Sequence, residues 1–111
     1  MQKAILVLFL LSILFLFFGC IQQQANASSE QLALKECKEL CTASLVRSDI
    51  PWPSGPCLGN PMQTNTDWVC DTAHNPRTAV DDLSENQCSA FPAQAKHFVE
   101  LNTECNLISL N

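Results

Sequence analysis

The segment Cys37-Lys-Glu-Leu-Cys41 decides the fold, because it places two cysteines one helical turn apart on the same face of a predicted helix. A direct bond between the two is disfavoured. Cysteines four residues apart on a helix lie near the upper limit of disulfide reach, with poorly aimed side chains. Each is therefore expected to bond outward to a different part of the chain, one to Cys57 or Cys70 and the other to Cys105.

The helix around these cysteines is predicted to run from about Glu30 to Arg47. Ser28 and Gln31 have the spacing of a capping box at its start. Apolar residues recur at helical spacing along one face, which is the pattern of an amphipathic helix. They are Leu34, Cys37, Cys41 and Leu45, with Leu32 and Leu40 broadening the stripe.

Short strands are expected after the helix. Three prolines in Asp49–Pro56 exclude a helix or a central strand there. Trp68–Cys70 and Cys88–Phe91 are plausible strands, and Lys96–Leu101 with Glu104–Leu110 predicts a C-terminal hairpin around Asn102-Thr103. Alternation places Phe98 on one face of this hairpin and Val99 and Leu101 on the other. The expected fold is a small disulfide-rich α+β domain, with one amphipathic helix packed on a short antiparallel sheet.

The cysteine count indicates how so small a domain is stabilised. The chain has 111 residues and seven cysteines, and about eighty residues with few large apolar groups form a thin core. Without Cys20, an even set of six is left, which predicts three disulfides in an exported protein. Six cysteines allow 15 pairings, so the connectivity stays open. The expected half-cystines are Cys37, Cys41, Cys57, Cys70, Cys88 and Cys105.

The first twenty residues have the character of an export segment. Lys3 supplies a short positive start, and Ala4–Gly19 is apolar except for one serine. Cys20 follows at once, and the next residues are rich in Gln, Asn, Ala and Ser. We therefore expect a signal segment or membrane anchor at 1–20, a flexible tether at 21–29 and an extracytoplasmic domain at 30–111.

The run Phe17-Phe-Gly-Cys20 resembles the lipobox of prokaryotic lipoprotein precursors, and its apolar segment and Gln-rich tether look archaeal. The resemblance implies that the Cys20 thiol is joined to a diacylglycerol, which would hold the domain on the outer face of the cytoplasmic membrane. Ala25-Asn-Ala27 offers a competing cleavage site that would release a secreted domain. An uncleaved anchor is the third possibility. We favour lipidation, then the anchor, then secretion.

The soluble part is similar to small uncharacterised, exported, Cys-rich archaeal proteins in three stretches, Trp68–Asp71, Asn86–Cys88 and His97–Glu100. This resemblance implies an extracytoplasmic location and no particular activity. From Cys20 onward, five basic residues face all eleven acidic ones, a formal charge of −6. That balance argues against nucleic acid as a partner and against electrostatic attraction to anionic lipid.

Two groups of residues could carry chemistry. Cys37, Cys41, Cys70 and His74 could form a Cys3His zinc site, but export favours disulfides, so we predict no metal and no cofactor. His74, Arg77 and nearby carboxylates could form an enzyme site. The simpler interpretation places His74 on a surface loop and pairs Arg77 with Asp71 or Asp81 at the surface. No catalytic residue is therefore assigned.

The two tryptophans differ in their expected roles. Trp68 lies in a predicted strand and is expected in the core. Trp52, between two prolines, is either a cap on the disulfide core or an exposed binding anchor, because Trp is enriched at interface hot spots. We expect a non-enzymatic binding or structural module with a protein or small-molecule ligand, and Trp52, His74 and Arg77 as its candidate binding residues. A small enzyme or enzyme accessory and a metal-binding protein are the alternatives.

Overall fold

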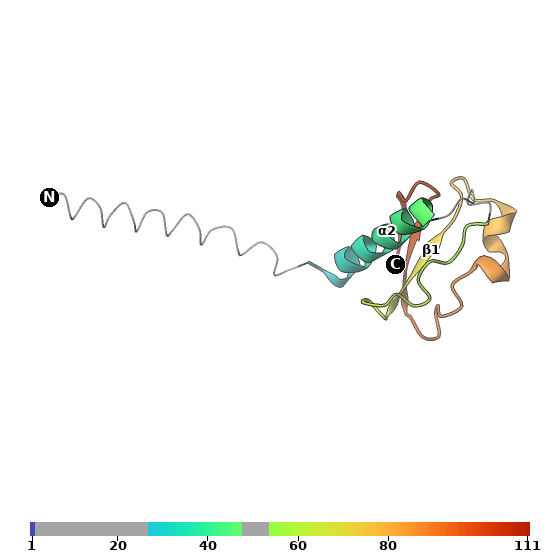
Figure 1. The fold of residues 1–111 in the computed structure, drawn as a ribbon. Helices are drawn as coiled ribbons and strands as arrows, with labels where there is room; N and C mark the ends of the chain where they lie inside the picture. The colour runs from blue at the N-terminus through green and yellow to red at the C-terminus, as the bar shows by residue number, and fades with distance from the viewer. Residues whose placement is uncertain (2–26, 48–53) are drawn as a thin grey trace.

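The computed structural model describes Met1, residues 27–47 and residues 54–111, and it confirms a small disulfide-rich α+β domain. Helix α2 (Ser29–Arg47) lies across one face of a three-stranded sheet (Figure 1). The strands are β1 (Trp68–Thr72), β2 (His97–Leu101) and β3 (Leu107–Leu110), in that order across the sheet. Two short 3-10 helices, η2 (Ala79–Asp82) and η3 (Ser84–Asn86), lie in the connection between β1 and β2. Within the described residues, no helix is long and apolar enough to cross a membrane.

Helix α2 begins with the predicted capping box. The Gln31 backbone N–H donates to Ser28 Oγ at 3.3 Å, and the Ser28 N–H donates to Gln31 Oε1 at 3.2 Å. The buried face is narrower than the predicted stripe, because only Ala33, Cys37 and Cys41 are fully buried. These small side chains, spaced four residues apart, let the helix lie close to the sheet.

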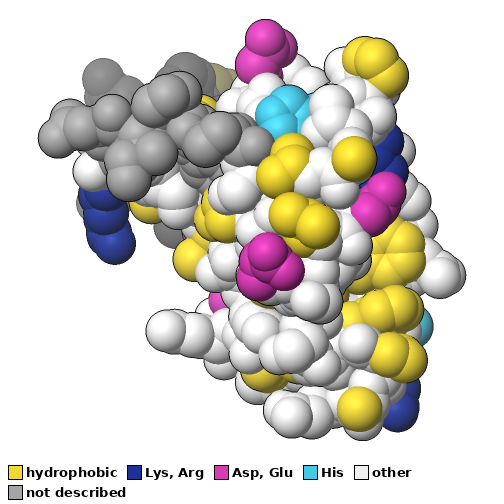
Figure 2. All heavy atoms as spheres, turned by 90° about the vertical axis from the view of Figure 1, so that its right-hand side faces the viewer, with side chains coloured by type: hydrophobic (Ala, Val, Ile, Leu, Met, Phe, Trp, Pro, Cys, Tyr) yellow, Lys and Arg dark blue, Asp and Glu magenta, His cyan; other side chains and the backbone are white. Residues whose placement is uncertain are grey.

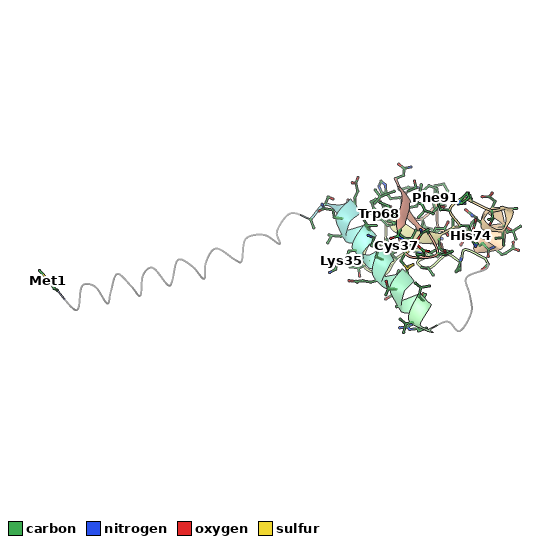
Figure 3. The ribbon with its side chains drawn as sticks, turned by 90° about the horizontal axis from the view of Figure 1, so that it is seen from above. Met1, Lys35, Cys37, Trp68, His74 and Phe91 are labelled. Atoms are coloured by element: carbon green, nitrogen blue, oxygen red, sulfur yellow. A yellow bond between two sulfur atoms is a disulfide. The ribbon has the colours of Figure 1, made fainter. Side chains whose placement is uncertain are left out.

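Two leucines of the predicted stripe do not belong to the buried face. Leu32 and Leu45 are exposed, with 47% and 39% of their surface accessible, because they lie beside the narrow line of contact rather than on it. Figure 3 shows the two sides of the helix, with Cys37 turned toward the rest of the domain and Lys35 turned away from it. Lys35 pairs with Glu39 on this outer side at 3.8 Å.

The sheet is mixed. The predicted antiparallel pairing is confirmed for β2 with β3 and is wrong for β1 with β2. Strand β1 runs parallel to β2, with Trp68 opposite His97 and Thr72 opposite Leu101. Residues 73–96 connect these strands and exceed the roughly dozen residues that a parallel crossover needs. The predicted strand at Cys88–Phe91 is also wrong. These residues form turns within the crossover, where the Phe91 N–H donates to the carbonyl of Cys88.

Strands β2 and β3 form the predicted C-terminal hairpin, with Val99 opposite Leu110. Its turn is longer than the expected Asn102-Thr103. The Asn102 side chain organises it by accepting hydrogen bonds from the N–H groups of Glu104 and Asn106. Cys105 has a positive φ of 64° in this turn. The predicted alternation is confirmed, because Phe98 faces away from α2 whereas Val99 and Leu101 pack beneath it.

The sheet separates two small hydrophobic clusters. The cluster on the α2 side consists of Ala33, Cys37, Cys41, Met62, Trp68, Cys70, Val99 and Leu101. The cluster on the opposite side consists of Val69, Cys88, Ala90 and Ala95, with Cys57, Phe91 and Phe98 packed against it. Both clusters contain few large aliphatic side chains, so each depends on the cysteines within it.

Three disulfides cross-link the domain. Cys37 bonds to Cys70 on β1, and Cys41 bonds to Cys105 in the hairpin turn. The expectation that these two helical cysteines have different partners is thereby confirmed. The third disulfide, Cys57–Cys88, lies on the face of the sheet opposite α2. Together the first two attach the helix to β1 and to the turn between β2 and β3.

Removing the Cys41–Cys105 disulfide by the double substitution Cys41→Ala/Cys105→Ala should lower the free energy of unfolding by about 4 kcal/mol. This bond spans 64 residues, whereas Cys57–Cys88 spans 31. Because the entropy of loop closure grows with loop length, the matched Cys57→Ala/Cys88→Ala variant should lose about 0.6 kcal/mol less. Urea denaturation of the three proteins measures both differences. An unchanged stability of the Cys41→Ala/Cys105→Ala variant would contradict the predicted role of this bond.

Candidate functional site

The titratable side chains His74, Arg77 and Asp81 lie in the segment that follows β1. Residues 73–82 turn back beside the sheet, and η2 begins directly after Thr78. The Thr78 N–H donates to Asp81 Oδ2 at 2.8 Å, and the Thr78 hydroxyl donates to the same oxygen at 2.9 Å. Asp81 therefore closes the first turn of η2 with its own side chain.

Asp81 pairs with His74, whose side chain is half-buried. The side chain of Asp81 is fully buried, and its Oδ1 lies 2.8 Å from His74 Nδ1. Burial alone would raise the pKa of Asp81, but hydrogen bonds from Thr78 and His74 outweigh it and lower the pKa to about 2. Gly55 packs directly against this carboxylate. Its φ is +58°, and an added Cβ would meet Asp81 Oδ1 and lie 2.8 Å from the carbonyl oxygen of Thr72. Glycine is thus required beside the pair.

Arg77 bridges η2 and β2. Its Nε donates to Asp82 Oδ1 at 2.8 Å, and its Nη1 donates to Glu100 Oε2 at 2.6 Å. The hydrogen bond to Asp82, and after it the one to Glu100, raises the pKa of Arg77 above its ordinary value. The predicted pairing of Arg77 with Asp71 or Asp81 is wrong. Arg77 pairs with Asp82 and with Glu100 on β2, whereas Asp71 is buried and Asp81 pairs with His74.

Asp71 is the one buried carboxylate of the sheet in the described part of the chain. It is 8% exposed and lies opposite Glu100 in the parallel register of β1 and β2. Burial raises the pKa of Asp71 to about 6, and the nearby Glu100 carboxylate adds to the increase, whereas the Thr72 N–H and Arg77 oppose it. A carboxylate oxygen of Asp71 and the sulfurs of Cys57 and Cys88 all lie within 4.8 Å of one another.

The structure brings together two of the predicted site residues. His74 and Arg77 lie in one loop, at the end of the domain far from α2, which Figure 3 shows for His74. Figure 2 shows this side of the domain, where hydrophobic side chains are interspersed with acidic groups and histidine. Trp52, the other candidate, lies outside the described residues, as does Cys20. Trp68 is buried as predicted and stacks on His97, with ring centroids 4.6 Å apart.

The zinc hypothesis fails on the chemistry of its ligands. Cys37, Cys41 and Cys70 are all half-cystines, so the thiolates that zinc requires are absent. The sulfurs near Asp71 are likewise bonded to each other. The proximity of Asp71 to this disulfide was not predicted from the sequence. The only signal for it was strand alternation, which places Asp71 on the face opposite Cys70.

The outer side of α2, away from the His74 loop, presents an open surface. The described residues that form it include Leu34, Thr42 and Val46. Val46 is 83% exposed, so the C-terminal end of the helix presents apolar surface to solvent. Comparison with known proteins finds no family model, no curated protein and no solved structure that matches this chain.

Replacing Asp71 with Asn should stabilise the protein at neutral and alkaline pH. The folded-state pKa of about 6 exceeds the ordinary value of 3.8, so the folded protein binds this proton more tightly than the unfolded chain. The resulting stabilisation is complete below about pH 4 and is lost as the pH rises through 6. Asn does not titrate. Between about pH 4 and 8, the free energy of unfolding of D71N should therefore rise by about 2–3 kcal/mol relative to the unsubstituted protein.

Urea denaturation across this pH range measures the difference. Glu85→Gln is the matched control, because Glu85 is an exposed carboxylate on η3, and it should show no such trend. A stability difference for D71N that does not change with pH would contradict the burial argument.

Proposed function

We propose that this chain is the precursor of a lipid-anchored protein, whose disulfide-stabilised domain acts as a non-enzymatic binding or structural module on the outer face of the cytoplasmic membrane. The observation that carries the extracytoplasmic location is the pairing of six cysteines in three disulfides. Such bonds form and persist in oxidising compartments and are rare in the cytosol.

The charge of the domain supports an anchor at the N-terminus. The part from Cys20 onward has a formal charge of −6, so the domain is not drawn to anionic lipid by electrostatics. Two acyl chains on Cys20 provide the stable attachment that a single chain does not. Helix α2 begins at Ser29, so only a short segment separates the proposed lipid from the domain.

A binding or structural role agrees better with the polar residues than catalysis does. Arg77 is held by Asp82 and Glu100, and His74 is held by buried Asp81. These side chains cross-link the loop to η2 and β2. The open surface along α2 is formed by other residues, where apolar Leu34 and Val46 lie among charged side chains. It offers a partner both apolar and charged contacts, as the rim of a binding surface does.

The enzyme alternative depends on His74, because a carboxylate on Nδ1 orients an imidazole for acid–base chemistry. Thr78 Oγ1 lies 3.2 Å from the same ring nitrogen, but its hydroxyl also donates to Asp81. The hydroxyl is therefore part of the η2 turn rather than a nucleophile facing the free ring nitrogen. This arrangement favours a structural role for the pair.

Replacing Cys20 with Ser should move the protein from the membrane fraction to the soluble fraction and remove acyl groups from its intact mass. The unsubstituted protein from its native membrane should carry acyl chains and lack the six hydrogens of three disulfides. The control Ala27→Asp disrupts the competing cleavage site and should leave both results unchanged. A mature mass that begins at Ser28 would contradict the lipid anchor.

Trp52 is proposed as the binding anchor, and fluorescence quenching tests whether it is exposed. The chain has two tryptophans, so Trp68→Phe leaves Trp52 as the only strong emitter, and Trp52→Phe leaves Trp68. Trp68 is 5% exposed and should be shielded from acrylamide. We expect Trp52 to be quenched about three times more strongly than Trp68, as an exposed anchor would be. Equal shielding of both would instead make Trp52 a core cap.

A further inference from the structure

The Cys57–Cys88 disulfide differs from the other two in its place in the fold. Cys37–Cys70 and Cys41–Cys105 attach α2 to the sheet, whereas Cys57–Cys88 lies on the opposite face and does not involve the helix. Cys37 and Cys70 are completely buried, whereas Cys57 is half-buried at the edge of its cluster, as Cys105 is in the hairpin turn. A reductant in solvent therefore has better access to Cys57 than to the sulfurs of Cys37 and Cys70.

Opening this disulfide would leave the surrounding backbone attached. The Leu58 and Gly59 N–H groups donate to the carbonyl oxygen of Cys70. The Cys70 N–H donates in turn to the carbonyl oxygen of Gly59 at 2.9 Å. These bonds hold the segment that carries Cys57 on the edge of β1. On the other side, the Ala90 N–H donates to Asn60 Oδ1 at 2.7 Å and holds the segment that carries Cys88.

A buried acid lies beside this disulfide. A carboxylate oxygen of Asp71 and both sulfurs fall within 4.8 Å of one another. The charged groups that face Asp71 are Glu100 on β2, Arg77 in the following loop and Asp81 on η2.

We propose that Cys57–Cys88 is a thiol–disulfide exchange site that accepts electrons from a dithiol, and that Asp71 donates a proton to the departing Cys88 sulfur. A thiolate of the reductant attacks Cys57 Sγ. The Cys57–Cys88 bond breaks as the new sulfur–sulfur bond forms, and the electron pair leaves on Cys88 Sγ. Asp71 transfers its proton to this sulfur and regains one from solvent.

The second thiolate of the reductant completes the reaction. It attacks the reductant's own sulfur in the mixed disulfide and releases Cys57 as a thiolate, which takes a proton from solvent. The reductant leaves as a cyclic disulfide, and the domain has gained two electrons and two protons.

The surroundings accommodate the products. Cys88 Sγ lies 3.5 Å from the carbonyl oxygen of Cys70, and Cys57 Sγ lies 3.7 Å from that of Gly59, so each new thiol has an acceptor. Burial raises the pKa of Asp71 to about 6, so a substantial fraction keeps its proton in mildly acidic solution. Ionised Asp71 has no proton to give and repels the leaving thiolate.

The test is reduction of the full-length chain by dithiothreitol, followed by rapid alkylation and peptide mapping of the freed cysteines. Cys57 and Cys88 should be alkylated about ten times faster than Cys37 and Cys70. With rates normalised to the dithiothreitol thiolate concentration, the rate constant for Cys57–Cys88 should fall about tenfold from pH 5 to pH 8, with a midpoint near the Asp71 pKa of about 6.

Asp71→Asn should abolish this fall, because its amide has no titrating proton. Glu104→Gln is the matched control, since Glu104 adjoins Cys105 of another disulfide, and it should keep the unsubstituted pH profile. Earlier opening of Cys37–Cys70 or of Cys41–Cys105 would overturn the proposed site. A normalised rate constant of the unsubstituted protein that does not change across pH 6, or a D71N profile equal to it, would overturn the role of Asp71.

Discussion

The attachment of α2 to the sheet through two disulfides on one helical face is the constraint on which the rest of the structure depends. The fully buried face of the helix consists of Ala33, Cys37 and Cys41, which together bury little apolar surface. Apolar burial contributes only about 25 cal/mol per Å², so this contact alone would hold the helix weakly. Cys37–Cys70 and Cys41–Cys105 supply the missing stability by restricting the unfolded chain.

The sheet also divides the domain into two chemically different halves. Strand alternation turns Cys70 and Val99 toward the helix, where the core is apolar. It turns Asp71 and Glu100 toward the crossover connection, where polar groups and a disulfide lie together. Burial raises the pKa of Asp71 to about 6, and the Glu100 carboxylate, which the parallel register of β1 and β2 places opposite it, adds to the increase.

Features controlled by local sequence were predictable. The capping box at Ser28, the helix that follows and the faces of the C-terminal hairpin all depend on residues close together in the chain. The parallel pairing of β1 with β2 was not predictable in this way, because it depends on the path of residues 73–96, whose prolines and short turns carry no periodic pattern. The partners of Arg77 depend on the same path, so they too differ from the prediction.

The sequence by itself determined the α+β class, the helix that begins at the capping box, and the separate partners of Cys37 and Cys41. Each follows from spacing along the chain, which sets the direction of a side chain on a helix or strand. Only the tertiary structure decided which cysteines pair, that Asp81 holds His74, and that Asp71 lies beside Cys57–Cys88. These contacts join residues brought together by packing, and composition and periodicity carry no information about such distances. The buried acid beside a disulfide is therefore a property of the fold, whereas the helix on the other face of the sheet is a property of the sequence.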